Sequence, residues 1–426
     1  MHAQADALSQ PVRRSCTTAE TASIGTSRRG FLGVAVTTPL AARIVAPRVA
    51  SGGGFAAGAE RLRVGLIGCG GRGTGAAVQA VAADPAVRLV ALGDLFPDQL
   101  AAAADLLSRR AGAQFDCPFE RRFAGADAFR RVIASGVDVV LLATPPHLRP
   151  LHLEAAVAAG KHVYCERPVA IDVKGVVRAA AAAARARAAG LAIVSGFCHR
   201  RDARTQACMA LVHDGAIGRP LHVEAHAAVG LPWRRPLESR HDPAAWPLRN
   251  WVSFRRFSGG HLVEHHVEAL DRAAWLLGDE APVAVEPLPH PEPQGPAAIG
   301  AIGDCRAGVA VRYLFADGRT ILASIDRRQR AGTAVAEMAF GTAGTCDLHA
   351  GVIAGSRAQH VLPPPAAGRH QAAMDALVRG ILSGRPADDG RTMCQSTLLA
   401  ILGSEAVETG RRQPWPGLAE SVAATT

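Results

Sequence analysis

The fold is decided by Arg61–Ala80, RLRVGLIGCGGRGTGAAVQA, and by Val87–Asp98, VRLVALGDLFPD. The apolar run Leu62–Ile67 predicts a buried parallel strand, and a glycine-rich turn then opens an Ala-rich helix. A second apolar run ends in an acid, Asp94, which lies 21 positions after Gly73. This order of strand, glycine turn, helix, strand and acid is typical of a dinucleotide-binding unit.

The glycines of this turn have different physical roles in such a unit. Gly68 permits the tight turn, Gly70 lets a pyrophosphate approach bare backbone, and Gly73 lets the helix pack on the strand. The helix N-terminus supplies unpaired N–H groups and the positive end of a dipole for the phosphates. The cofactor contacts predicted from this motif are Gly68, Gly70, Gly71, Arg72, Gly73 and Asp94.

The acid also indicates which dinucleotide binds. Asp94 is expected to accept hydrogen bonds from the adenosine ribose, so its carboxylate occupies the place that a 2′-phosphate would need. Leu95 and Phe96, which follow it, offer no cation to offset that repulsion. The sequence therefore predicts NAD(H) in preference to NADP(H).

Composition excludes several other classes of protein. A length of 426 residues predicts two domains, and the net charge of +10 comes from arginines scattered along the chain rather than from a basic tract. With only 4% aromatic residues to stack on bases, we expect no nucleic-acid partner. The nine cysteines form no CxxC pair, so we expect no metal site and no disulfide framework. No run approaches the roughly 20 apolar residues that span a bilayer.

The first 60 residues differ from the rest. Ser27-Arg28-Arg29-Gly30-Phe31-Leu32, followed by the mildly apolar segment Gly33–Ala42, resembles a twin-arginine export signal. We expect residues 1–60 to be a signal and linker, and the protein to fold in the cytoplasm before export to the periplasm. The alternative is an arginine-rich tail without that role.

Strands and helices alternate over residues 61–197, which predicts a doubly wound, mostly parallel α/β sheet. The expected strands are Leu62–Ile67, Val87–Leu92, Val137–Ala143, His162–Cys165 and Leu191–Phe197, and the expected helices include Pro97–Ala111, Leu151–Ala159 and Val173–Ala189. The pattern changes over residues 198–426, where consecutive strands without helices between them predict an α+β domain with a largely antiparallel, open-faced sheet. Its expected helices are Ala203–Asp214, Leu262–Leu277, Gln371–Leu382 and Thr392–Thr409, and its expected strands are Leu221–Ala228, Gly308–Phe315, Thr320–Asp326, Ala334–Gly341 and Gly344–Leu348.

A family resemblance rests on Ala143–Asp172, ATPPHLRPLHLEAAVAAGKHVYCERPVAID. This segment resembles the glucose–fructose oxidoreductase/inositol dehydrogenase/MocA family, especially its exported branch, and the likeness continues in order from Arg61 to Pro416. The resemblance implies an oxidoreductase that passes a hydride between nicotinamide and a sugar or cyclitol, and association of subunits through the C-terminal sheet. It also implies cofactor contacts from Thr144, Pro145, Pro146, His147 and Glu166.

The chain departs from this family at both positions that handle the substrate proton. Arg167 stands at the position of the family's lysine, and Glu268 stands at the position of its helix histidine. Because arginine keeps its charge, Arg167 can hold an alkoxide but cannot act as a base. Helical spacing places Glu264, Glu268 and Asp271 on one face, where crowding raises the pKa of one carboxyl and suits it to general base catalysis. The alternative is a solvated or ion-paired helix face.

We therefore predict that Arg167 pairs with Glu268, with their side-chain ends within about 6 Å. Glu268, or His266 beside it, would take the substrate proton, with Glu264 as a further catalytic candidate. The substrate contacts predicted with less support from the sequence are Arg200, Trp246, Arg249, Asn250, His265 and Asp271.

Three functions are compatible with these residues. The first is an NAD(H)-dependent sugar or cyclitol oxidoreductase. The second is a redox-neutral enzyme that oxidises a glycoside transiently, cleaves or isomerises it and returns the hydride. The third is a non-catalytic dinucleotide- and sugar-binding protein.

Overall fold

Two β-sheets organise the part of the chain that the structure describes. The computed structural model describes residues 61–238, 242–290, 303–327, 333–356, 358–364 and 368–416, which all belong to one compact unit. The predicted export signal lies outside these residues.

The first sheet has six parallel strands in the order β3-β2-β1-β4-β5-β6. Its strands are β1 (Leu62–Ile67), β2 (Val87–Asp94), β3 (Arg122–Ala124), β4 (Val139–Leu142), β5 (His162–Cys165) and β6 (Ile193–Ser195). They alternate with α1 (Gly71–Ala83), α2 (Pro97–Ala111), α3 (Ala128–Ala134), α4 (Arg149–Ala158) and α5 (Val173–Ala188), and with the 3₁₀ turns η1 (Gly112–Gln114) and η2 (Phe119–Arg121). β4 and β5 are fully buried, as uninterrupted apolar runs predict. The doubly wound sheet is confirmed.

The second sheet has nine strands in the order β14-β13-β12-β11-β7-β10-β9-β8-β15. They are β7 (Pro220–Ala228), β8 (Ala284–Pro287), β9 (Gly308–Leu314), β10 (Thr320–Asp326), β11 (Ala334–Gly341), β12 (Gly344–Asp347), β13 (Val352–Gly355), β14 (Gln359–Val361) and β15 (Gln413–Pro414). Only β7 and β10 pair in parallel, and the other pairs are antiparallel. The sheet is therefore mixed and largely antiparallel, as expected.

One predicted helix of this region is broken. Residues 262–277 were expected to form one helix, but the structure has α9 (His261–Glu264) and α10 (Val267–Leu276), with a turn at His265 and His266. The remaining elements are η3 (Cys198–Arg201), α6 (Ala203–His213), η4 (Pro243–Ala245), α7 (Trp246–Arg249), η5 (Trp251–Ser253), α8 (Arg255–Ser258), α11 (Arg369–Leu382) and α12 (Gly390–Thr409).

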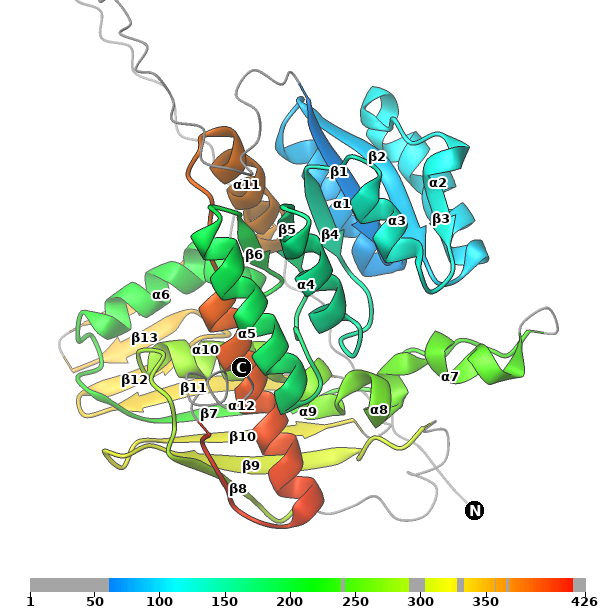
Figure 1. Cartoon of the computed structure of the whole chain (residues 1–426). Helices are drawn as coiled ribbons and strands as arrows, with labels where there is room; N and C mark the ends of the chain where they lie inside the picture. The colour runs from blue at the N-terminus through cyan, green and yellow to red at the C-terminus, as the bar shows by residue number, and fades with distance from the viewer. Residues whose placement is uncertain are drawn as a thin grey trace, which may run out of the picture. The chain divides into compact units, whose positions relative to one another are not determined.

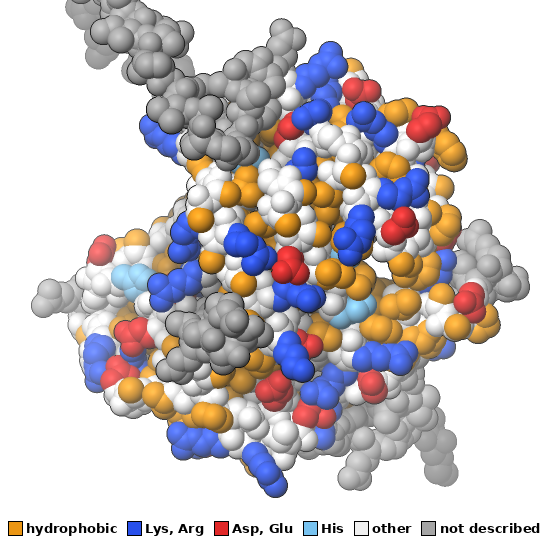
Figure 2. All heavy atoms as spheres, viewed as in Figure 1, with side chains coloured by type: hydrophobic (Ala, Val, Ile, Leu, Met, Phe, Trp, Pro, Cys, Tyr) orange, Lys and Arg blue, Asp and Glu red, His pale blue; other side chains and the backbone are white. Residues whose placement is uncertain are grey.

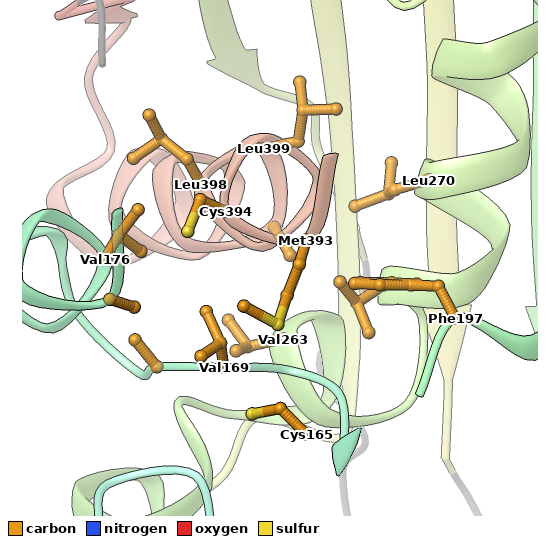
Figure 3. Close-up of a cluster of buried hydrophobic side chains, with 14 of the residues drawn as sticks. Cys165, Val169, Val176, Phe197, Val263, Leu270, Met393, Cys394, Leu398 and Leu399 are labelled. Carbon is orange, nitrogen blue, oxygen red and sulfur yellow. The ribbon is translucent and has the colours of Figure 1, made fainter. Parts of the chain in front are cut away.

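Helix α12 lies across the strands of the second sheet and also contacts α5 of the first (Figure 1). Figure 3 shows Met393, Cys394 and Leu398 of this helix facing Val169, Val176 and Val263. These side chains are among the fully buried residues of one hydrophobic cluster, which includes residues from both sheets. The shared core holds the two sheets together through the apolar area it removes from water.

Helix α11 packs against α1 although it follows the second sheet in sequence. Its buried side chains Ala373, Met374 and Leu377 join the hydrophobic cluster around β1 and α2. The first sheet is thus covered in part by a helix that comes some 180 residues after its last strand begins.

On the face drawn in Figure 2, acidic and basic side chains are interspersed, so no large patch there carries only one sign of charge. Within the described residues, no helix is both long and apolar enough to cross a bilayer.

Candidate active site

A cavity of about 820 Å³ opens where β1, β2 and β4 end. The predicted cofactor residues that line it are Gly68, Gly70, Gly71, Arg72, Gly73, Asp94, Thr144, Pro145 and His147. Pro146 is buried beside the cavity and does not line it. The carboxyl edge of a parallel sheet, next to the reversal in strand order, is where such folds bind ligands.

The four glycines of the turn differ in the space around them, and Gly68, Gly70 and Gly73 differ as the sequence predicts. Gly68 has φ +95°, and a Cβ there would lie 2.6 Å from the carbonyl carbon of Ala143. A Cβ on Gly73 would lie 1.9 Å from the Gly68 carbonyl oxygen. Gly70 and Gly71, by contrast, have open space where a Cβ would be. The turn is therefore closed on the strand side and open toward the cavity, which leaves room for a phosphate group at the N-terminus of α1.

The carboxylate of Asp94 is fixed by backbone donors. It accepts hydrogen bonds from Cys69 N at 2.6 Å and Phe96 N at 2.8 Å. Burial is the largest cause that raises its pKa, while these two hydrogen bonds act in the opposite direction. The remaining lone pairs of the carboxylate face a cavity that it helps to line.

Residues of the segment that follows β7 line part of the cavity, near Asp94 and Phe96, and they include the predicted substrate contact Arg249. Trp233, Arg235, Leu248, Arg249 and Trp251 all line the cavity. The guanidinium of Arg249 lies 4.0 Å from the Phe96 ring centroid and donates to both carboxylate oxygens of Asp98, at 2.8 and 2.9 Å. Arg249 thus lies at the cofactor cavity, and a cation does stand near Asp94, contrary to the sequence-based interpretation.

Two other predicted substrate residues hold this segment in place. Asn250 is wholly buried, accepts from Arg235 N at 2.8 Å and donates to the carbonyl oxygens of Arg235 and Trp246. The Trp246 indole N–H donates to the Arg235 carbonyl oxygen at 3.1 Å. Sugar contacts by these residues stay predictions, and Asn250 could make one only if this segment opened.

Glu166 connects the cavity to the predicted catalytic residues. Its carboxylate lies 3.2 Å from Arg72 Nε, and it accepts from the Tyr164 hydroxyl at 2.9 Å. Only 4% of Glu166 is exposed. Glu166 does not line the cavity itself. It contacts Arg72, which does line the cavity, and it directly precedes Arg167 in the sequence.

Arg167 lies between two carboxylates, and its predicted pair with Glu268 is present. Arg167 Nε is 3.3 Å from Glu268 Oε1, and Nη1 is 3.4 Å from Glu264 Oε1. Nη1 also donates to the Glu264 carbonyl oxygen at 2.6 Å, at the end of α9. A side chain that donates to a helix carbonyl in this way accounts for the turn between α9 and α10. Asp271, the third acid of the predicted face, lies beyond that turn and has other partners.

The two glutamates titrate in opposite directions. Burial raises the pKa of Glu264 to about 7, against the attraction of Arg167 and Arg149. For Glu268 the attraction of Arg167, followed by His199 and Arg272, outweighs burial and lowers the pKa to about 2. Glu264 Oε2 is buried and has no hydrogen-bond partner among the described residues. Of the two acids, Glu264 therefore has the properties of a proton acceptor near neutral pH.

His266 and Asp271 have structural partners. The His266 side chain is 2% exposed, and its Nε2 donates to the Ala225 carbonyl oxygen at 2.9 Å, since a carbonyl can only accept. Burial lowers its pKa to about 4. Asp271 accepts from Arg200 Nε at 2.9 Å and from the Ser396 hydroxyl at 2.6 Å, while Arg200 also binds Asp279. Their predicted substrate and relay roles stay untested, and any such contact would compete with these bonds.

The structure adds residues that the sequence analysis did not select. His199, on η3, interacts electrostatically with Glu268, Arg272 and Arg369, and burial lowers its pKa to about 4. His370, at the start of α11, has Nδ1 3.0 Å from the Cys198 sulfur. No local pattern marks these residues, because they come together only through the docking of α11. Among the residues that the structure describes, no three metal-ligating side chains gather into a metal site.

Comparison with known proteins agrees with this geometry. Residues 62–193 match the model of the GFO_IDH_MocA family, described as an oxidoreductase family with an NAD-binding Rossmann fold. An inositol 2-dehydrogenase from Rhizobium meliloti is 30% identical over 271 residues, which cover 64% of this chain and 70% of that protein. The chain belongs to the Gfo/Idh/MocA oxidoreductase family.

Other similar proteins share less of their length or of their sequence with this chain. Inositol 2-dehydrogenase 4 from Saccharopolyspora erythraea is 31% identical, over 57% of this chain and 61% of its own length. Aldose-aldose oxidoreductase from Caulobacter crescentus, solved with glycerol, has a TM-score of 0.63 at 22% identity, over 83% of this chain and all of that one. Levoglucosan dehydrogenase, solved with NADH and levoglucosan, has a TM-score of 0.64 at 20% identity, over 84% of this chain and all of its own. These structures establish the two-sheet fold.

The glycine geometry predicts a contrast between two substitutions. Gly73→Ala places a methyl group against backbone and should destabilise the protein by about 1–3 kcal/mol. Gly71→Ala, the matched control at a position with open space, should leave the melting temperature nearly unchanged. Thermal unfolding of both variants checks this, and equal melting temperatures would contradict the close approach of α1 to the turn.

Proposed function

We propose that the protein is an NAD(H)-dependent oxidoreductase that transfers a hydride at a ring carbinol of a sugar or cyclitol. The observation that carries the proposal is the connection from the dinucleotide cavity, through Arg72 and Glu166, to an arginine held between two glutamates. The inositol dehydrogenases among its relatives support the cyclitol part of this substrate class.

The residues of the cavity suit NAD(H). The open space at Gly70 and Gly71 fits a pyrophosphate, and Asp94 presents a fixed carboxylate to a ribose diol. When bound, the nicotinamide supplies the acceptor or donor of the hydride.

Arg167 and Glu264 supply the rest of the chemistry. In the oxidation direction, the guanidinium of Arg167 orients the substrate hydroxyl and stabilises negative charge as it develops on that oxygen. The proton of the hydroxyl passes to the Glu264 carboxylate, whose Oε2 has no hydrogen-bond partner in the described part of the chain. Glu268 keeps Arg167 in position and offsets the cost of burying its charge. This assigns the proton to Glu264 rather than to Glu268 or His266.

A panel of sugars, cyclitols and glycosides incubated with the protein and NAD separates this proposal from its alternatives. Accumulation of NADH with a keto product is the expected result. Cleavage or isomerisation without NADH would identify the redox-neutral enzyme instead. Binding without turnover of any compound would identify a non-catalytic protein.

The cofactor preference gives a testable prediction. Because the carboxylate of Asp94 repels a 2′-phosphate and Asp98 engages Arg249, NAD(H) should bind at least tenfold more tightly than NADP(H), on the order of 1.4 kcal/mol. Calorimetry measures both affinities, and Asp94→Ala should narrow the difference. Equal or tighter binding of NADP(H) by the wild-type protein would contradict the assignment.

The role of Glu264 predicts a particular pH profile. Since Glu264 must be ionised to accept a proton, the rate of oxidation should rise as the pH passes through about 7 and level off above it. Glu264→Gln should lower kcat by about a hundredfold and remove this limb, with little change in NAD affinity.

Glu268→Gln is the matched comparison. In this variant the rise of the oxidation rate with pH should persist but occur at lower pH, because the charge of Glu268 is one of the causes that raise the pKa of Glu264. Full activity in Glu264→Gln, or loss of the rise near pH 7 in Glu268→Gln alone, would show that Glu268 is the proton acceptor instead.

We further propose that subunits associate through the second sheet. Helices α10 and α12 cover one side, toward which the buried Val223 and Ala225 of β7 point. The alternate residues His222, Glu224 and His226 point to the other side and remain partly exposed. Among the described residues this side of β7 is partly exposed, which supports a homo-oligomer.

We also propose export by the twin-arginine route, on the strength of Arg28, Arg29, Phe31 and Leu32. Replacing both arginines by lysine should retain the folded protein in the cytoplasm of its native host, because this route depends on that pair. Fractionation followed by immunoblotting measures the distribution. An unchanged amount of protein in the periplasm would show that residues 1–60 are a tail without a role in transport.

A further inference from the structure

Arg327, the residue that follows β10, is a buried arginine without an acidic partner among the residues that the structure describes. Only 9% of it is exposed, and its Nε has no hydrogen-bond partner in the described part of the chain. Its backbone N–H donates to the Ala307 carbonyl oxygen at 2.7 Å, which fixes the position of the residue at the end of the strand. Burial alone lowers the pKa of its guanidinium, with no acid among the causes.

Other buried arginines of the described chain have partners that explain them. Arg272 forms an ion pair with Glu337, and Arg149 donates to the Pro168 carbonyl oxygen at 2.5 Å and has the carboxylates of Glu264 and Glu166 among its charged neighbours. A guanidinium stays charged in a protein, and burying a charge without compensation is costly. The burial of Arg327 therefore calls for a negative group that the described residues do not supply.

Two histidines beside Arg327 also have unused polar atoms. Helix α9 packs against β10, and the rings of His261 and His265 lie 5.3 Å apart. The Nδ1 atoms of both rings are buried without a hydrogen-bond partner among the described residues. Burial, followed by the charge of Arg327, lowers the pKa of His261 to about 3 and that of His265 well below its usual value. Both rings are therefore neutral at neutral pH, and each can donate one N–H.

This cluster adjoins the proposed reaction centre. His265 is next in sequence to Glu264, and the charges of both Arg327 and Arg167 are among the causes that lower its pKa. A substrate whose hydroxyl lies at Glu264 and Arg167 could thus present another group to the histidines and Arg327.

We propose that Arg327, His261 and His265 form a subsite for the carboxylate of a sugar acid. This inference deepens the proposed function and rests on it. One cation compensates one negative charge, and neutral imidazole N–H groups complete the hydrogen bonds of a carboxylate, to which an arginine fork binds in a bidentate manner. A phosphate dianion would leave one negative charge uncompensated in this setting, so a monoanionic substrate fits better.

Binding to the NAD-loaded, full-length protein tests the subsite directly. Calorimetry compares glucuronate and galacturonate with glucose and galactose, and gluconate with sorbitol, while glucose 6-phosphate represents the dianion. At least one acid should bind tenfold or more tightly than its neutral counterpart, and the phosphate should not. Arg327→Met should abolish that preference and leave the affinity for neutral compounds and for NAD unchanged. If no acid binds more tightly than its counterpart, or if Arg327→Met keeps the preference, the subsite is wrong.

Thermal stability gives a second readout that needs no turnover. Removing an uncompensated buried charge should raise the melting temperature of the ligand-free protein in Arg327→Met, and the further increase caused by the preferred acid should disappear. Arg312→Met is the matched control, because Arg312 is exposed and paired with Glu286, and it should change neither value. A lower melting temperature in Arg327→Met would show that the arginine is paired within the protein and overturn the proposal.

The carboxylate subsite and the proposed oxidoreductase function can be refuted independently of each other. Oxidation of neutral sugars or cyclitols without any preference for acids would refute the subsite and leave the proposed function intact. Tight, Arg327-dependent binding of an acid without NAD-linked turnover would uphold the subsite and refute the oxidoreductase.

Discussion

The candidate site depends on how the charge of Arg167 is balanced. A permanent cation next to the Rossmann sheet has to be paired when it is buried, and Glu264 and Glu268 of the second domain provide that pairing. The same guanidinium donates to the carbonyl at the end of α9, so it also fixes where the helix turns. One side chain therefore contacts both acids, and its sequence neighbour Glu166 contacts Arg72 of the cavity.

Glu264 and Glu268 share Arg167 as a partner, but their pKa values shift in opposite directions. Glu268 is held ionised by Arg167 and further cations, whereas burial dominates at Glu264 and keeps its pKa close to neutrality. Two carboxylates of the same kind can thus take different tasks because their surroundings differ. In the proposed mechanism, an arginine at the position of the family's lysine does not remove the proton acceptor, because that role falls to Glu264 beside it.

The parts of the fold set by local pattern could be predicted from the sequence. Apolar runs gave β1, β5 and β10 at their observed bounds, and the spacing from Gly68 to Asp94 defined the cofactor turn. The Arg167–Glu268 pair was predictable from the family resemblance, which places the two residues at facing positions, together with the cost of burying either charge without a partner.

Features that depend on contacts distant in sequence could not be predicted in this way. The turn at His265 and His266 results from a guanidinium contributed by another element, which helical periodicity does not reveal. Arg249 was expected at the sugar, but its fork binds Asp98 at the cofactor cavity. His370 reaches the site only because α11 packs on α1, some 300 residues earlier in the chain.

The protonation of Glu264 is the central claim, and it can be measured without a substrate. Titration of ¹³C-labelled glutamate side chains by NMR, in the wild-type protein and in Glu264→Gln, follows each carboxyl directly. The account predicts one carboxyl that titrates at about pH 7 and is missing from the variant. If every glutamate carboxyl that titrates does so below pH 5, Glu264 is an ordinary ionised acid, and the proposed division of roles between the two glutamates is wrong.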